Sequence, residues 1–195
     1  MAKFFGNLHL VLLAGLVLAL AVAYHFQGAS DELIAIGWVT AFTWLHVFFG
    51  ILWIGLLYYL NFVQVPTMPK IPAELKGGIT GYIAPRVLFF FRYGALLTVV
   101  TGLALSIFKG YGHRAMTFNG ATAAENLIGL GMWLALIMAF NVWFIIWPAQ
   151  KKILGLVEAT PEAKAAAAPR ALYASRTNLL LSLPMLYCMV NANLG

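Results

Sequence analysis

The residues that could carry chemistry stand inside long apolar stretches. His46 lies in the run TWLHVFFGILWIGLLYY, residues 43–59, and Gly50 and Trp53 follow it four and seven positions later. These spacings place the three residues on one face of a helix. An imidazole beside a glycine at membrane depth indicates either an axial haem ligand or a histidine that hydrogen-bonds between packed helices. The spacing alone leaves both interpretations open.

A second set of polar residues is expected at a different depth. Arg92, Asn141 and Asn178 each stand several residues inside an apolar run, and Asn61 lies near the inner end of another. Amide oxygens are natural acceptors for a guanidinium, so we predict a polar cluster of these residues that clamps the helices together. No carboxylate is expected there. Arg92 is therefore left either to extend toward the interface or to hold an anion, such as a haem propionate, a lipid headgroup or an anionic substrate.

The composition places these residues in a membrane protein. Hydrophobic residues make up 63% of the 195 residues, and charged residues make up only 9%. A soluble domain has about 45–50% apolar and about 25% charged residues, so here a lipid-facing surface must replace the polar one. The net charge of +6 comes from basic residues at the ends of apolar runs, and it does not indicate nucleic-acid binding. The single cysteine, Cys188, excludes an internal disulfide and a covalent haem site.

Five apolar runs are long enough to cross a bilayer, which takes about 20 residues. We predict an all-α bundle of five transmembrane helices that forms a single domain, residues 1–195. The predicted spans are about 8–26, 34–63, 86–109, 125–148 and 171–193. The first is interpreted as a retained helix, because its apolar core is longer than that of a signal peptide. Residues 65–78, with three prolines, are predicted to be irregular, and 158–170 to form a short surface helix.

The distribution of lysine and arginine sets the expected orientation. One set of loops carries Lys3, Lys70, Lys76, Arg86, Lys151, Lys152, Lys164 and Arg170. The opposite loops carry Lys109 and Arg114, with Asp31 and Glu32 in the first of them. By the positive-inside rule, the N-terminus is expected in the cytoplasm. The expected location is the bacterial cytoplasmic (inner) membrane, crossed several times.

Four stretches carry a more specific pattern: WLHVFFGILWIGLLYYLNFVQVP (44–66), PRVLFFFRYGALLTVVTGLAL (85–105), NVWFIIWPAQKKIL (141–154) and SRTNLLLSLPMLYCMVNANL (175–194). Together they resemble the membrane domain of the PuuD-type urate hydroxylases. In that family a cytochrome c domain follows the membrane part, whereas this chain ends at Gly195 without a CxxCH motif. The resemblance implies a short form of this membrane domain, whose electrons would pass to a separate protein such as a cytochrome c.

A more distant likeness is to the HemJ-type protoporphyrinogen oxidases and to CopD-like membrane proteins. These are small helical bundles with a histidine early in a helix that contains W-x-G, as His46 precedes Trp53-Ile54-Gly55. In the HemJ family that histidine binds haem, which implies a b-type haem on His46 in a pocket shaped by Gly50 and Trp53. The lysine that this family uses in a later helix has no counterpart in the predicted span 125–148.

Two functional hypotheses follow. The first is a membrane redox protein or subunit resembling the urate hydroxylase membrane domain, an oxidoreductase that needs a separate electron acceptor. The second is a non-catalytic accessory subunit of a larger respiratory or photosynthetic complex, or a homo-oligomer. Small residues such as Gly94, Thr98 and Gly102 would provide its contact surface. A transporter is disfavoured because the five runs show no inverted repeat, and no motif of nucleotide chemistry or hydrolysis is present.

Overall fold

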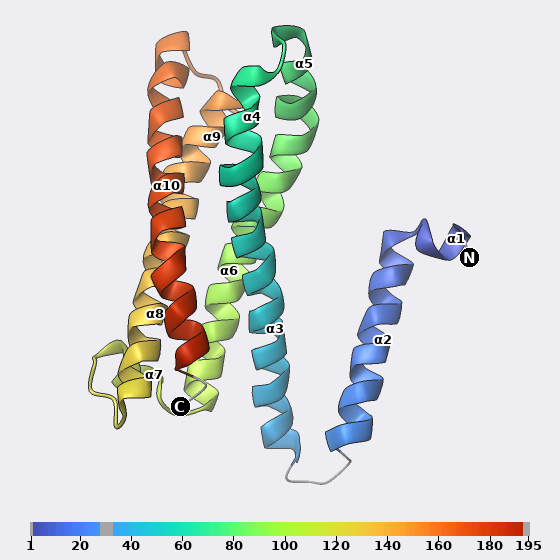
Figure 1. Ribbon diagram of the computed structural model, residues 1–195, viewed down its shortest axis with the longest axis vertical. Coiled ribbons are helices and arrows are strands. Elements are labelled where there is room, and N and C mark those ends of the chain that lie inside the picture. Colours follow the sequence, from blue (N-terminus) through green and yellow to red (C-terminus); the bar gives the residue numbers. More distant parts are fainter. Residues whose placement is uncertain (1, 28–32, 193–195) are drawn as a thin grey trace. The chain divides into compact units, whose positions relative to one another are not determined.

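The structure is a computed structural model that describes residues 2–27 and 33–192 (Figure 1). These residues form helices joined by short loops, without a strand among them, which confirms the predicted all-α class. Four helices are long and apolar enough to cross a membrane: Leu8–His25, Gly37–Lys70, Ala73–Phe108 and Ala123–Ile153. The chain divides into two compact units, Met1–Thr40 and Ala41–Gly195.

The first unit contains α1 (Ala2–Phe5), α2 (Leu8–Gln27) and the start of α3 (Leu33–Tyr58). Asn7 begins α2, because its Oδ1 accepts from the backbone N–H groups of His9 and Leu10 at 3.0 and 3.3 Å. None of the apolar window of α2 is buried. A helix that is apolar all round suits a membrane or a protein neighbour. Asp31 and Glu32, which enter the orientation argument, lie outside the described residues.

The second unit begins with two long helical rods. In the first rod α3 is followed by η1 (Tyr59–Gln64), α4 (Val65–Thr67) and η2 (Met68–Lys70). The second rod consists of α5 (Ala73–Gly78), η3 (Ile79–Ile83) and α6 (Ala84–Phe108). The prediction that residues 65–78 are irregular was therefore wrong, since only Ile71 and Pro72 interrupt the helices. Pro69 stands in the first turn of η2, and Pro66 follows the π turn η1, whose wider hydrogen-bonding pattern accommodates it.

Two further rods complete the second unit. The chain continues through α7 (Gly112–Met116), α8 (Ala123–Phe140), η4 (Asn141–Ile146), α9 (Trp147–Ile153) and α10 (Pro161–Asn191). Thr122 caps α8, because its Oγ1 accepts from the backbone N–H of Glu125 at 3.2 Å. Helices α4, α5 and α9 lie toward one end of this unit, and α7 lies at the other (Figure 1).

Helix α10 differs from the prediction of a surface helix at 158–170 and a separate span at 171–193. It is one helix of 31 residues. Thr160 caps it by accepting from the backbone N–H of Ala163 at 3.2 Å, and the alanines before Pro169 favour helix strongly enough to carry it past that proline. Helix α10 is not among the four candidate spans, because residues such as Arg176 and Asn178 lower its hydropathy. The fifth span stays a prediction.

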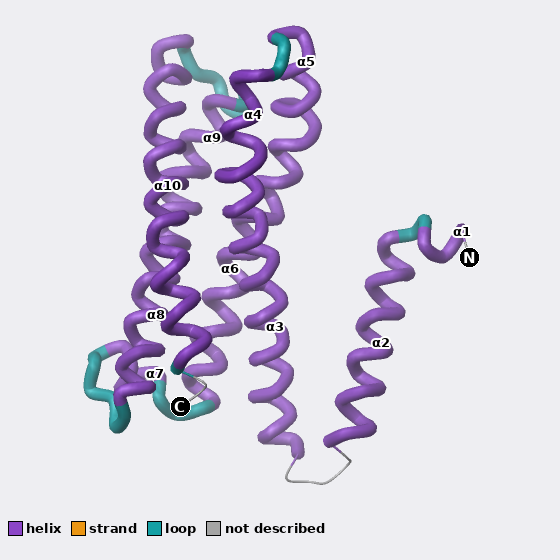
Figure 2. The backbone as a smooth tube through the Cα atoms, in the orientation of Figure 1, coloured by secondary structure: helices purple, strands orange, loops and turns teal. Residues whose placement is uncertain are grey.

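The core of the second unit lies where the rods meet side by side, with loops only at their ends (Figure 2). Trp53, Leu57, Phe91, Met138 and Val142 are at most 1% exposed and belong to this core. Their side chains come from three of the four rods, so burying them is what holds the rods together. This packing fixes the faces on which the polar residues stand.

Small residues let the rods approach closely within the chain. A Cβ on Gly94 would lie 3.3 Å from the backbone nitrogen of Trp53, and one on Gly131 would lie 2.9 Å from Cβ of Cys188. A Cβ on Gly129 would overlap the carbonyl oxygen of Ala115. Gly94, which was expected to contact a partner protein, thus packs against Trp53 within this chain.

Candidate functional site

Three rods of the second unit contain a turn of π-helix toward the same end (Figure 1). The segments η1, η3 and η4 each end two residues before a proline, respectively Pro66, Pro85 and Pro148. Proline has no N–H, and its ring collides with the carbonyl four residues earlier, so the turn before it widens. Widened turns of this kind often occur at functional sites. Here they carry Asn61, Asn141 and Trp143.

His46 joins α3 to α6. Its Nδ1 lies 2.9 Å from the carbonyl oxygen of Thr98 and 3.4 Å from Oγ1 of Thr101. A carbonyl only accepts, and the Thr101 hydroxyl already donates to the carbonyl of Leu97 at 2.6 Å. The proton of the imidazole is therefore placed on Nδ1, and Nε2 keeps its lone pair. Gly102 makes room for the ring, since a Cβ there would lie 2.7 Å from Cε1.

Gly50 and Trp53 lie with His46 against α6. Trp53 is fully buried, and its backbone faces Gly94. A Cβ on Gly50 would lie 4.0 Å from Cγ2 of Thr98, which is ordinary contact. The structure thus brings the three predicted residues onto one face, and that face packs on a neighbouring helix. The indole Nε1 of Trp53 is buried without a hydrogen-bond partner among the described residues.

Asn141 and Asn178 form a buried amide pair. Asn141 Nδ2 donates to Asn178 Oδ1 at 2.9 Å, and Asn178 Nδ2 donates to the carbonyl oxygen of Met138 at 2.9 Å. Asn178 is fully buried, so these bonds form away from water. The pair ties α10 to the junction of α8 and η4.

Asn61 joins the same helix, α10, from another rod. Its Nδ2 donates to Ser175 Oγ and to the carbonyl oxygen of Leu57, both at 2.9 Å. One helical turn before it, the hydroxyl of Tyr58 lies 3.2 Å from Ser182 Oγ, which donates to the carbonyl of Leu179. The tyrosine is therefore the donor to Ser182. Among the described residues, Asn61 makes no hydrogen bond to Asn141 or to Asn178.

The guanidinium of Arg92 contacts tryptophan rings instead of these amides. The central carbon of its guanidinium, Cζ, is 3.3 Å from the ring centroid of Trp147 and 5.8 Å from that of Trp143. Only 9% of the residue is exposed. Nε and Nη1 have no hydrogen-bond partner among the described residues, and neither has Nε1 of Trp143. The predicted guanidinium–amide bonds are thus replaced by contact with two indoles.

The sequence analysis missed Trp143, Trp147 and Lys151 as parts of this site. Lys151 Nζ lies 5.8 Å from the ring centroid of Trp147, so that one indole contacts two cations. The signal was present, because these three residues follow one another at intervals of four positions and hence share a helix face. Trp147 also lies near a helix end, where an aromatic residue usually anchors the protein at the membrane interface.

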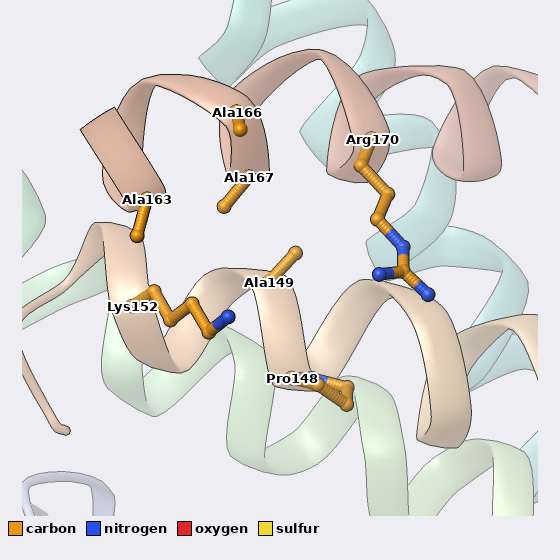
Figure 3. Close-up of a pocket in the computed structure, with 7 residues that line it drawn as sticks. All are labelled: Pro148, Ala149, Lys152, Ala163, Ala166, Ala167 and Arg170. Atoms are coloured by element: carbon orange, nitrogen blue, oxygen red, sulfur yellow. The ribbon is translucent and has the colours of Figure 1, made fainter. Parts of the chain in front are cut away.

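A small open pocket lies beside this cluster, between α9 and α10 (Figure 3). Its volume is about 170 Å³, and it is lined by Pro148, Ala149, Lys152, Ala163, Ala166, Ala167 and Arg170. Figure 3 shows Arg170 reaching from α10 toward α9. The alanines supply an apolar floor and the two basic residues supply positive charge, while no acidic residue lines the pocket.

A family of known proteins matches part of the chain. Residues 114–195 match the family described as urate oxidase N-terminal. The predicted resemblance to the urate hydroxylase membrane domain is thereby confirmed for the part of the chain that contains the stretches 141–154 and 175–194. His46 and Arg92 lie outside the matched residues. Neither a curated protein nor a solved structure matches the chain.

The chemistry of His46 fits one axial ligand of a haem. Histidines that bind metals commonly donate their second ring N–H to a backbone carbonyl, as Nδ1 does to Thr98. The described residues contain no group of three or more His, Cys, Asp or Glu that could hold a bare metal ion. A haem needs no such group, since its porphyrin supplies four of the ligands and the protein supplies only the axial ones.

Proposed function

We propose that this chain is a membrane redox protein or subunit of the urate hydroxylase membrane-domain type, with a b-type haem on His46. The observation that carries the proposal is the hydrogen bond of His46 Nδ1 to the carbonyl of Thr98, which leaves Nε2 as a ligand. The family match over residues 114–195 supports the redox class. Five crossings of the bacterial inner membrane, with the N-terminus in the cytoplasm, are part of the same proposal.

Each residue near His46 then has a task. The Thr98 carbonyl orients the imidazole and makes Nε2 more basic. Gly102 gives the ring its space, and Gly50 adds no side chain on the same face of α3. Trp53 holds α3 against α6 through its contact with Gly94. A bound haem would supply one-electron chemistry, and a separate protein such as a cytochrome c would accept the electrons.

The test is a dithionite-reduced minus air-oxidised visible spectrum of protein purified in mild detergent after expression with added haem. We expect a shifted Soret band with sharp α and β bands, and we expect His46→Ala to abolish them. His113→Ala is the matched control, because His113 is an exposed histidine of α7. An unchanged spectrum in His46→Ala would exclude the ligand assignment, and a flat spectrum of folded wild-type protein would exclude the haem.

A second candidate function is that of an accessory subunit of a larger membrane complex. The observation that favours it is α2, whose apolar window has no buried residue. Co-purification separates the two proposals. An accessory subunit would leave the membrane with stoichiometric partner proteins and without a pigment, whereas the redox protein would carry haem of its own.

A further inference from the structure

Arg92 is a buried cation without an acidic partner among the described residues. Its side chain leaves α6 and lies over Trp147, with Cζ 3.3 Å from the ring centroid. A separation this short fits two planar groups that lie face to face. Stacking uses the face of a guanidinium, whereas its N–H groups point outward in its plane. The contact with Trp147 therefore stabilises the charge and leaves the hydrogen-bonding capacity of Nε and Nη1 unused.

The neighbouring amides do not take up these donors. Asn141 and Asn178 are bonded to each other, and Asn178 also bonds to Met138. Asn61 donates to Ser175 through Nδ2, and its Oδ1 is buried without a hydrogen bond to Arg92 or to any other described residue. A buried guanidinium without an acceptor is costly, and the cost falls when an acceptor binds.

A second cation and a further donor lie around the same pair of indoles. Lys151 Nζ lies 5.8 Å from the ring of Trp147, so the indole is shared by two positive charges. Trp143, whose ring centroid is 5.8 Å from Cζ of Arg92, has a buried Nε1–H that lacks a partner. The one ion pair found among the described residues, Arg114–Glu125, belongs to the region around α7, at the opposite end of the unit.

We propose that Arg92, Trp143 and Lys151 bind an anionic oxygen group, the carboxylate or phosphate of a ligand, beside the face of Trp147. The cluster offers donors and positive charge and no acceptor, which is the complement of such a group. Guanidinium and carboxylate or phosphate match in geometry as well as in charge. The proposed anion site does not require haem, so it can exist whether or not His46 binds one.

The surrounding surface admits two sources of this group. Tyr93 and Phe144, next to Arg92 and Trp143 in the chain, are 41% and 64% exposed, so the cluster lies close to the outside of the unit. Lys152 and Arg170 add positive charge next to this cluster, because both line the pocket that also contains Pro148. Basic pockets between helices at the membrane interface bind lipid headgroups. A phospholipid phosphate or a soluble carboxylate would satisfy the same donors.

The experiment compares the two sources in delipidated protein in mild detergent. Native mass spectrometry counts bound phosphatidylglycerol, with diacylglycerol as the control lipid that lacks a phosphate. Thermal unfolding with added acetate or inorganic phosphate tests the soluble source. The variants are Arg92→Gln and Lys151→Gln, and the matched control is Arg86→Gln. Arg86 is an exposed arginine of α6, so this change removes the same charge from the same helix.

We expect wild-type protein and Arg86→Gln to bind the anion alike. Arg92→Gln should weaken binding at least about tenfold, since it removes a charge-assisted hydrogen bond, and Lys151→Gln should weaken it less. Dependence on Arg92 with phosphatidylglycerol assigns a lipid, and the same dependence with acetate or phosphate alone assigns a soluble ligand. The proposal is overturned if neither anion binds, or if Lys151→Gln and Arg92→Gln bind as wild type. Lys151 is only partly buried, so its variant keeps the test valid if Arg92→Gln fails to fold.

Discussion

Buried polar groups are hydrogen-bonded to one another between α8 and α10, whereas on α6 some of them are left without partners. Between α8 and α10, the Asn141–Asn178 pair and the Met138 carbonyl satisfy one another at 2.9 Å. On α6, two nitrogens of Arg92 have no hydrogen-bond partner in the part of the chain that the structure describes. The histidine that packs on α6, His46, uses only one of its two ring nitrogens for the Thr98 carbonyl.

This difference separates groups that hold the fold from groups that remain able to bind. A hydrogen bond already made inside the chain stabilises the bundle and has nothing to offer a ligand. An unused donor or lone pair adds no stability, but it can recognise a ligand. Among the described residues, buried polar atoms without partners lie on α3, η1 and α6, outside the family match, and at Trp143 inside it.

The largest expected effect comes from breaking the amide pair. Asn178→Leu would leave Asn141 Nδ2 and the Met138 carbonyl without their partner in the core. We expect the free energy of unfolding in detergent to fall by about 2–4 kcal/mol, measured by circular dichroism. Asn191→Leu in the same helix is the control, because Asn191 donates only to the nearby carbonyl of Tyr187 at an exposed site. Equal stability of the two variants would contradict the role given to the pair.

A smaller loss is expected from crowding His46. Gly102→Ala would place a Cβ 2.7 Å from Cε1 of the imidazole, so the ring or the helix must move. We expect a destabilisation of about 1–3 kcal/mol and a change in any haem spectrum. Gly55→Ala is the control, since nothing lies within 4 Å of its Cβ. If Gly102→Ala were as stable as Gly55→Ala, the imidazole would not be held where the structure places it.

Removing the charge of Arg92 should affect the free energy of unfolding differently from removing the amide of Asn178. Arg92→Met deletes a buried cation without hydrogen-bond partners at Nε and Nη1 and keeps an apolar chain over Trp147. Without added anions, we expect the free energy of unfolding to stay within about 1 kcal/mol of wild type or to rise. A loss as large as that of Asn178→Leu would mean that the guanidinium is already satisfied inside the protein.

The smallest effect is expected at the exposed pair Arg114–Glu125. Its atoms lie 2.7 Å apart, and the hydrogen bond to Glu125 raises the pKa of Arg114 above its ordinary value. Solvent screens such pairs, so Arg114→Gln should leave the unfolding midpoint unchanged within error, at low and at high salt. A midpoint that falls at low salt alone would show that the pair does hold α7 to α8.

Hydropathy and capping chemistry predict much of this fold. The predicted apolar runs coincide with the four candidate spans, and most of the predicted ends lie within a few residues of the observed ones. Thr122 marks the start of α8. The prolines of residues 65–78 were misread, because a proline breaks a helix only where its N–H is needed. The predicted boundary at residue 170 was also wrong, because the alanines before Pro169 favour helix and α10 continues past that proline.

The candidate site was predictable in its residue types and less so in its partners. The spacing of His46, Gly50 and Trp53 places them on one face, which the structure shows, but it cannot say that α6 covers that face. The choice of Arg92 between amides and indoles is also a contact between separate helices. Such contacts depend on how rods rotate and slide against one another, and periodicity within one rod does not determine this.

The π turns have a consequence for how sequences of this kind are aligned. A π turn amounts to one residue inserted into an α-helix, so everything beyond it is rotated about 100° relative to an unbroken helix. In η4 the insertion lies between Asn141, which bonds to Asn178, and Trp147, which lies against Arg92. A homologue that lacks this residue would keep the letters on both sides of the gap. Its tryptophan and lysine would nevertheless be rotated by about 100° away from Arg92, so a one-residue gap at this place in an alignment marks the loss of that contact.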